Sequence, residues 1–95
     1  MKQIFILPSF ERSAKKLSKP QRIALSESLN AFNHFVVTGH AGHGLAIKKI
    51  NHDKFEFRVD IRLRVIFKET KDGYYLVLVG NHDTVRRYLR EYRNI

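Results

Sequence analysis

Two segments in the second half of the chain carry the residue patterns of β-strands. From Phe55 to Val65 the odd-numbered residues are apolar and the even-numbered ones are charged. Successive side chains of a strand point to opposite faces, so this alternation predicts a sheet with one apolar and one charged face. Residues 74–79 are apolar on both faces, which predicts a central strand covered from two sides.

Helix signals occupy the first half of the chain. Pro8 and Ser9 open a helix with Ser9 as the expected N-cap, and apolar residues recur through it at helical spacing. Ser18 and Gln21 have the spacing of a capping box and start a second helix, which Gly39 is expected to end. The two helices are expected to form a hairpin on one face of the sheet.

The remaining elements follow from short apolar runs and turn residues. Strands are expected at residues 4–7, 45–50, 55–60, 64–69 and 74–79. Asp72-Gly73 predicts a hairpin turn, since Asp-Gly supplies positive backbone dihedrals, and Asp83 or Thr84 is expected to cap a final helix. The predicted class is α+β in the order β-α-α-β-β-β-β-α. A two-helix hairpin would pack on a small, mostly antiparallel sheet, with one more helix at the C-terminus.

Composition is that of a small folded domain. The 95 residues are 43% hydrophobic and include seven Phe and four Tyr, so residues 1–95 are expected to form a single domain. The sequence has no cysteine, which excludes disulfides and Cys-based zinc sites. The first apolar run is too short for a signal peptide, and no segment has the length of a membrane span. A cytoplasmic location is expected.

The net charge of +9, from 18 Lys and Arg against 9 Asp and Glu, indicates a polyanionic or acidic partner. Nucleic acid is the favoured ligand, because such basicity in a small domain is typical of nucleic-acid binding. A membrane surface is less favoured, since no helix sets Lys and Arg against a large aromatic face. An acidic protein partner is compatible with nucleic acid and could use the same surface.

The histidines are candidates for metal binding or acid–base chemistry: His34, His40, His43, His52 and His82. A metal site needs three or four converging ligands, and only His40 and His43 are closely spaced, so no metal site is expected. His82 follows a predicted buried strand and precedes a helix, where its ring would be rigidly held. Imidazole can protonate a leaving group near neutral pH, although this ring could equally cap or pack the helix start.

Arg58, Arg62 and Arg64 are close in sequence, on segments expected to form sheet. Guanidinium groups bind phosphate oxygens in a fixed fork and stay charged, which favours phosphate binding over a merely solvated face. Lys48 and Lys49 extend this patch on the preceding strand. Because strand side chains alternate, only one of the two lysines can share a face with the arginines.

The C-terminal segment places an aromatic ring among cations. Tyr88 follows Arg86 and Arg87, so it could stack on a base while the arginines flank the phosphates; packing in the core is the alternative. The sequence carries no phosphate-binding glycine loop, nucleophile elbow or Cys nucleophile. Cations, one mounted histidine and an aromatic ring suit a metal-independent ribonuclease, because RNA supplies its own 2′-hydroxyl nucleophile.

Two motifs resemble the RelE/ParE superfamily of bacterial type II toxins. One is similar to the family's arginine-bearing strand pair, Arg58-Val59-Asp60-x-Arg62-x-Arg64-Val65-Ile66-Phe67. The other is similar to its lead into the last helix, Leu78-Val79-Gly80-Asn81-His82-Asp83-x-Val85-x-x-Tyr88. Element order, size and basicity extend the likeness over nearly the whole chain.

The resemblance implies a role for several residues by position. Arg64 matches the family's transition-state arginine, Arg58 a basic residue that contacts phosphate, and His82 the general acid of the YoeB-type branch. Tyr88 falls near the tyrosine that stacks on the substrate in RelE. Glu56 stands where RelE has a lysine as general base.

A carboxylate can serve as a base, so Glu56 is the expected base, with His43 or Lys49 as alternatives. The leading hypothesis is therefore an endoribonuclease toxin that cleaves mRNA, in the ribosomal A site as its relatives do, and leaves a 2′,3′-cyclic phosphate. It would need no metal or other cofactor.

Two alternatives stay open: a ParE-like inhibitor of DNA gyrase that acts by protein contact, and an RNA-binding module without catalysis. The expected partners are mRNA, the ribosome and a cognate antitoxin, with no membrane. The antitoxin would be acidic in its toxin-binding segment and would cover the basic face.

Overall fold

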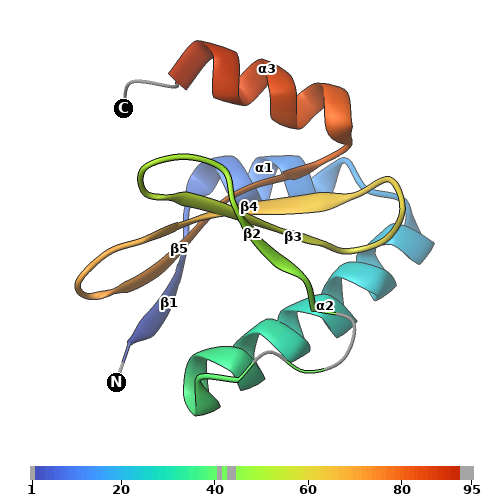
Figure 1. Cartoon of the computed structure of the whole chain (residues 1–95). Coiled ribbons are helices and arrows are strands. Elements are labelled where there is room, and N and C mark those ends of the chain that lie inside the picture. Colours follow the sequence, from blue (N-terminus) through green and yellow to red (C-terminus); the bar gives the residue numbers. More distant parts are fainter. Residues whose placement is uncertain (1, 41, 43–44, 93–95) are drawn as a thin grey trace.

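The computed structural model describes residues 2–40, 42 and 45–92 (Figure 1). Its elements are β1 (Gln3–Ile6), α1 (Pro8–Lys15), α2 (Lys19–Thr38), β2 (Ile47–Lys49), β3 (Lys54–Arg58), β4 (Arg64–Glu69), β5 (Gly73–Gly80) and α3 (His82–Tyr92). The α+β class and the element order agree with the sequence prediction. Within the described residues, no helix combines the length and the apolar character of a bilayer-spanning segment.

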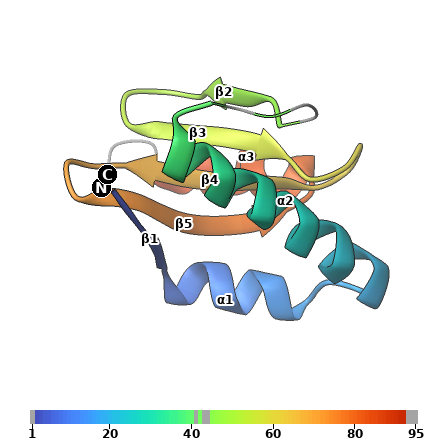
Figure 2. The ribbon, with the colours of Figure 1, turned by 90° about the horizontal axis from the view of Figure 1, so that it is seen from below.

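Five strands form one sheet in the order β1-β5-β4-β3-β2. β1 pairs with β5 in parallel and the other pairings are antiparallel, so β2 to β5 form a meander. β5 has a neighbour on each side, which confirms that the apolar run at residues 74–79 is an inner strand. Figure 2 shows α2 crossing in front of the sheet, α1 running beside β1 and β5, and α3 behind.

Apolar side chains pack on both faces of the sheet. The larger core lies under α1 and α2, where the ring of Phe32 stacks on that of Phe57 with centroids 5.0 Å apart. The smaller core lies under α3, where Val85 packs with Ile66 and Val77. α3 packs mainly on β4 and β5, so the outward face of β3 stays open.

A β-bulge interrupts the pairing of β4 with β5. Ile66 pairs with Leu78 and Phe67 with Leu76, so Val77 has no partner in β4. Leu76 belongs to the larger core, whereas Val77 and Leu78 both contribute to the smaller one. A bulge adds a residue and re-aims the side chains beside it, so strict alternation fails at this point.

Two serines of α1 close the outer edge of β5 beyond the end of β1. The Ser9 hydroxyl donates to the carbonyl oxygen of Val77 over 2.6 Å, and the Ser13 hydroxyl accepts from the Val79 N–H over 3.0 Å. An open sheet edge offers unpaired backbone groups, and these bonds satisfy two of them. The prediction of Ser9 as N-cap is wrong: Leu7 holds that position without a side-chain bond, and Pro8 begins the helix.

The other helix ends test three further predictions. Ser18 and Gln21 form the predicted capping box, and Gly39 ends α2 in the left-handed conformation with φ 78°. The predicted cap of α3 by Asp83 or Thr84 is wrong. The Asn81 side chain accepts from the Thr84 N–H over 2.8 Å, because Asn81 is the last residue before the helix.

The β4–β5 hairpin forms at the predicted place by a different mechanism. Among the described residues only Gly39 has a positive φ, so Asp72 and Gly73 do not use the conformation expected of them. Instead, the N–H groups of both residues donate to the Thr70 hydroxyl at 3.2 and 3.3 Å. Gly73 is needed for another reason, since a Cβ there would lie 2.1 Å from the carbonyl oxygen of Gln3 in β1.

A buried lysine begins β3. Lys54 is only 3% exposed, and its Nζ lies 3.5 Å from a carboxylate oxygen of Asp53. The other oxygen of Asp53 lies 3.5 Å from Nζ of Lys68. Burial by itself would raise the pKa of Asp53, but the charges of Lys54 and Lys68 outweigh it and hold the pKa below its ordinary value.

Candidate active site on the charged sheet face

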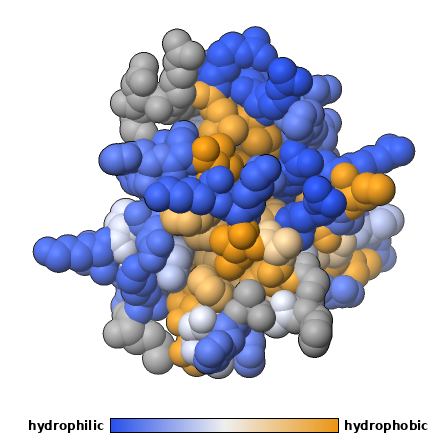
Figure 3. All heavy atoms as spheres, viewed as in Figure 1, coloured by the Kyte–Doolittle hydropathy of each residue, from blue (hydrophilic) through white to orange (hydrophobic). Residues whose placement is uncertain are grey.

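Four charged side chains share one face of β2, β3 and β4. Arg58 and Arg64 pair directly across β3 and β4. Glu56 lies two residues before Arg58 and so points the same way, and Lys48 of β2 pairs with Glu56. Figure 3 shows hydrophilic side chains in a band across the strands, with apolar side chains above and below it.

Arg64 lies between a carboxylate and an imidazole. Its Nη1 is 2.6 Å from Nδ1 of His82, and its Nε is 3.4 Å from Oε2 of Glu56. The side chains of Arg64 and Glu56 are 21% and 18% exposed, so both are partly withdrawn from water. Charged hydrogen bonds are stronger where water is scarce, and the two partners therefore fix the guanidinium at this position.

The fold places His82 beside Arg64 through the end of β5. Gly80, the last residue of β5, pairs with Arg64, and His82 is the first residue of α3 two positions later. A guanidinium only donates hydrogen bonds, so Nδ1 of His82 accepts and the proton of the neutral ring lies on Nε2. The residue is exposed, which leaves the ring open to a ligand.

A hollow of about 560 Å³ opens next to these side chains. Glu56, Arg58 and Lys48 line it together with the β3–β4 loop. Both cations are exposed, whereas Glu56 is half-buried. The hollow is therefore a site where an anionic ligand could meet two cations beside a carboxylate.

The expectation that Arg62 lies on a sheet-forming segment is wrong. β3 ends at Arg58 and β4 begins at Arg64, so Arg62 lies in the connecting turn rather than on a strand. The carboxylate of Asp60 accepts from the N–H groups of Arg62 and Leu63 at 2.7 and 2.8 Å, which is an Asx-type turn. Asp60 therefore ends the alternation, and Arg62 turns away from the other two arginines to line another surface.

Lys49, one of the two alternative bases, does not join this group. Lys49 pairs with Phe55 and lies over its ring at 5.9 Å, on the face opposite to Lys48. This confirms that only one of the two lysines shares the arginine face. His43 lies outside the described residues. Within the part of the chain that is described, no three His, Asp or Glu side chains come close enough together to hold a metal ion.

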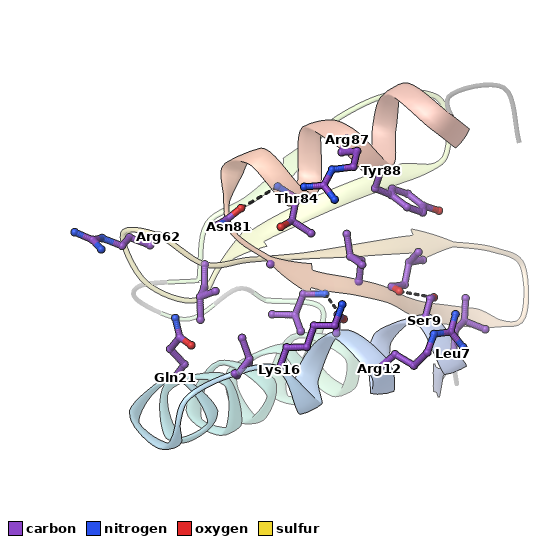
Figure 4. A pocket seen from close by; sticks show the side chains of 17 residues that line it. Leu7, Ser9, Arg12, Lys16, Gln21, Arg62, Asn81, Thr84, Arg87 and Tyr88 are labelled. Atoms are coloured by element: carbon purple, nitrogen blue, oxygen red, sulfur yellow. Dashed lines mark hydrogen bonds between the residues drawn. The ribbon is translucent and has the colours of Figure 1, made fainter.

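The remaining predicted residues lie on α3, on a second surface. Arg87 and Tyr88 line a groove between α1 and α3, together with Arg62. Figure 4 shows Arg87 reaching from α3 toward Lys16, the residue that follows α1. Arg86 instead lines a smaller hollow on the outer side of α3. Tyr88 also packs against the smaller core, as the alternative interpretation of this residue required.

Sequence reasoning missed two cations of this groove, Arg12 and Lys16. Arg12 lies on α1 and Lys16 directly follows the last residue of this helix, at i, i+4, the spacing of neighbours on a helix surface. This spacing is visible in the sequence. Nothing in the spacing indicates that α1 and α3 approach each other.

No family model matches the chain, and no curated protein matches it. Solved structures do. RelE in the RelB–RelE antitoxin–toxin complex from Methanococcus jannaschii superposes with a TM-score of 0.68 at 15% identity, covering 88% of this chain and 96% of that one.

Two further structures give the same result. YafQ from E. coli has a TM-score of 0.69 at 11% identity, with 90% of this chain and 98% of YafQ covered. A YoeB dimer from Staphylococcus aureus has a TM-score of 0.63 at 13% identity, with 85% and 97% covered. At these identities the likeness concerns the fold alone. The chain therefore has the fold of RelE, YafQ and YoeB, as the resemblance in sequence predicts.

Proposed function

We propose that the chain is a RelE-like toxin that cleaves mRNA without a metal ion. The observation that carries the proposal is the position of Arg64 between Glu56 and His82, next to Arg58 on an open sheet face. These are the groups that RNA cleavage through the 2′-hydroxyl needs: a base, cations for the developing charge and an acid. All of them belong to rigid elements or their ends.

The proposed reaction is an in-line attack within one nucleotide. Glu56 takes the proton of the 2′-hydroxyl, and the 2′-oxygen forms a bond to phosphorus. The bond from phosphorus to the 5′-oxygen breaks, and His82 in its protonated form gives that oxygen a proton. Arg64 and Arg58 bind the non-bridging oxygens, whose negative charge increases in the transition state. The products are a 2′,3′-cyclic phosphate and a free 5′-hydroxyl.

Substrate binding would rearrange the contact between Arg64 and His82. In the free protein the guanidinium of Arg64 donates to Nδ1 of His82. A bound phosphate competes for the guanidinium and adds negative charge beside the ring.

An antitoxin and the ribosome are the proposed partners. RelE has been solved with RelB, YafQ with DinJ, and YoeB with YefM. The net charge of +9 suits both an acidic antitoxin segment and RNA. RNA contacts by Lys48, Lys49, Arg62, Arg86, Arg87 and Tyr88, and a cytoplasmic location, remain predictions.

Induced expression tests the proposal directly. We expect the parent chain to arrest growth and to produce cleaved mRNA, and Arg64→Ala and His82→Ala to abolish both effects. Lys15→Ala, an exposed change on α1 outside the site, is the matched control and should arrest growth fully. Arrest by both site variants as complete as that of the parent would show that these residues are not the active site. Arrest with gyrase-dependent DNA breaks and intact mRNA would favour the ParE-like alternative.

A further inference from the structure

A groove with a cavity volume of about 780 Å³ runs between α1 and α3, along the outer edge of β5. Four cations line it: Arg12, Lys16, Arg62 and Arg87. The described residues that line it include no Asp or Glu. None of the four cations forms an ion pair with another described residue. The lining of the groove therefore carries net positive charge, which attracts an anionic ligand.

The floor of the groove is aliphatic. Leu7, Leu17, Leu63, Leu78 and Val79 line the groove together with the four cations. Single-stranded RNA is bound through phosphates and through bases stacked on aromatic rings, and Tyr88 is the only aromatic residue among the described lining residues. An aliphatic floor with cationic walls is better suited to a peptide that has both apolar and acidic side chains.

The edge of β5 limits the form of such a peptide. Ser9 and Ser13 already bond to the carbonyl of Val77 and the N–H of Val79, the backbone groups that an added strand would use. A partner strand would have to break both bonds. A helix needs no backbone partner, and its apolar side chains could lie on the floor while its acidic side chains face the walls.

We propose that the α1–α3 groove binds an acidic amphipathic helix of a partner protein. The proposal rests on the acidic partner of the proposed function but not on RNA cleavage, because neither Arg64 nor His82 is among the residues that line the groove. It adds a docking surface that is distinct from the charged face of β3 and β4.

The test measures binding of a synthetic helical peptide to the whole chain. About 14 residues span roughly 21 Å as a helix, comparable to the shortest dimension of the molecule, 21 Å. The probe carries Leu along one helical face and Glu elsewhere. A second peptide of the same composition, with its Leu residues scattered around the helix, controls for charge alone.

Charge reversal on both walls is the decisive variant. We expect Arg12→Glu combined with Arg87→Glu to weaken peptide binding about tenfold or more, because opposite charges become like charges at the contact. Lys15→Glu combined with Arg90→Glu makes the same change in net charge on the same two helices, outside the groove lining. Exposed charges remote from the peptide are screened at physiological salt, so this control should lose no more than roughly twofold.

Several results would overturn the proposal. These are equal losses in the two variants, equal affinity for the scrambled peptide, or no binding of the amphipathic peptide by the parent chain. Loss of oligouridylate binding in the groove variant, with peptide binding unchanged, would make the groove an RNA site. Arg12→Gln with Arg87→Gln, which adds no acid, repeats the test if the first variant does not fold. Because no RNA is cleaved in this assay, an inactive nuclease would not affect its outcome.

Discussion

Nη1 of Arg64 lies 2.6 Å from Nδ1 of His82, although 18 positions separate the two residues in sequence. The contact depends on the pairing of Arg64 with Gly80 and on the start of α3 directly after Asn81. If either residue lay on a flexible loop, forming this contact would cost more conformational entropy, because the loop would have to be ordered first. The same pairing that builds the sheet therefore also assembles the candidate site.

Replacing Arg64 by Lys should separate charge from geometry. Lysine keeps the positive charge but lacks the planar fork that can bind a phosphate and a second partner together. We expect Arg64→Lys to lower the rate of mRNA cleavage by about 10²-fold or more, as removal of a transition-state donor does in other enzymes. Single-turnover cleavage measures the effect, with Arg90→Lys on α3 as the control. A rate within a factor of about three of the parent's would mean that charge alone suffices.

Glu56 can act as the base or merely hold Arg64, and Glu56→Gln distinguishes the two roles. Glutamine keeps the size and can accept a hydrogen bond from Arg64, but it cannot take a proton. If Glu56 is the base, we expect cleavage to fall by about 10²- to 10⁴-fold while RNA binding is kept. A loss below about tenfold would assign Glu56 the positioning role.

Gly73→Ala should destabilise the fold through β1. The added Cβ would lie 2.1 Å from the carbonyl oxygen of Gln3, which is backbone and must therefore move with its strand. We expect a loss of about 2–3 kcal/mol in the free energy of unfolding, measured with urea. Gly42→Ala, where nothing lies within 4 Å of the added Cβ, is the matched control and should change stability little. Equal stability of the two variants would contradict the close approach of β1.

Asp53→Asn should weaken the fold and reduce its sensitivity to acid. The pKa of Asp53 is lower in the folded chain than its ordinary value of 3.8, so the ionised carboxylate stabilises the fold. This contribution is fully present above that value and is lost as the pH falls below it. We expect the variant to lose about 1–2 kcal/mol at neutral pH, because the partly exposed carboxylate no longer faces buried Lys54.

Urea unfolding at pH 7 and at about pH 3 checks the effect of Asp53. The stability difference between the parent and Asp53→Asn should shrink at the lower pH. Asp72→Asn, an exposed carboxylate in the β4–β5 turn, is the control. A difference that stays constant between the two pH values would show that the charge of Asp53 does not contribute.

The sequence was most informative where the structure depends only on the spacing of apolar and charged residues along the chain. Alternation placed Glu56 and Arg58 on one face and limited Lys48 and Lys49 to one residue on that face, because side chains of a strand alternate whatever the tertiary context. The capping box at Ser18 and the end of the second helix at Gly39 were also predictable, because each depends only on residues that are neighbours in sequence.

Features that depend on distant contacts were not predictable from the pattern. The alternation continues through Arg62, yet the carboxylate of Asp60 bonds to the backbone beyond it and forms a turn. The local sequence predicts Ser9 as an N-cap, but its hydroxyl donates to a carbonyl oxygen of β5 instead. The local sequence likewise predicts Gly73 as a turn residue, but glycine is needed there because β1 lies against it. Local propensity competes with tertiary contacts in each case, and the tertiary contact decides.

The chemistry at the ends of the cleaved RNA tests the candidate active site most directly. Purified chain would be incubated with ribosomes and a defined mRNA, and the fragment ends would be identified by mass spectrometry. We expect a 2′,3′-cyclic phosphate and a 5′-hydroxyl with the parent, no fragments with His82→Ala, and none when the nucleotide at the cleavage site carries a 2′-deoxyribose. Cleavage of the 2′-deoxy substrate, or an unchanged rate with His82→Ala, would contradict attack by the 2′-hydroxyl with His82 as the acid.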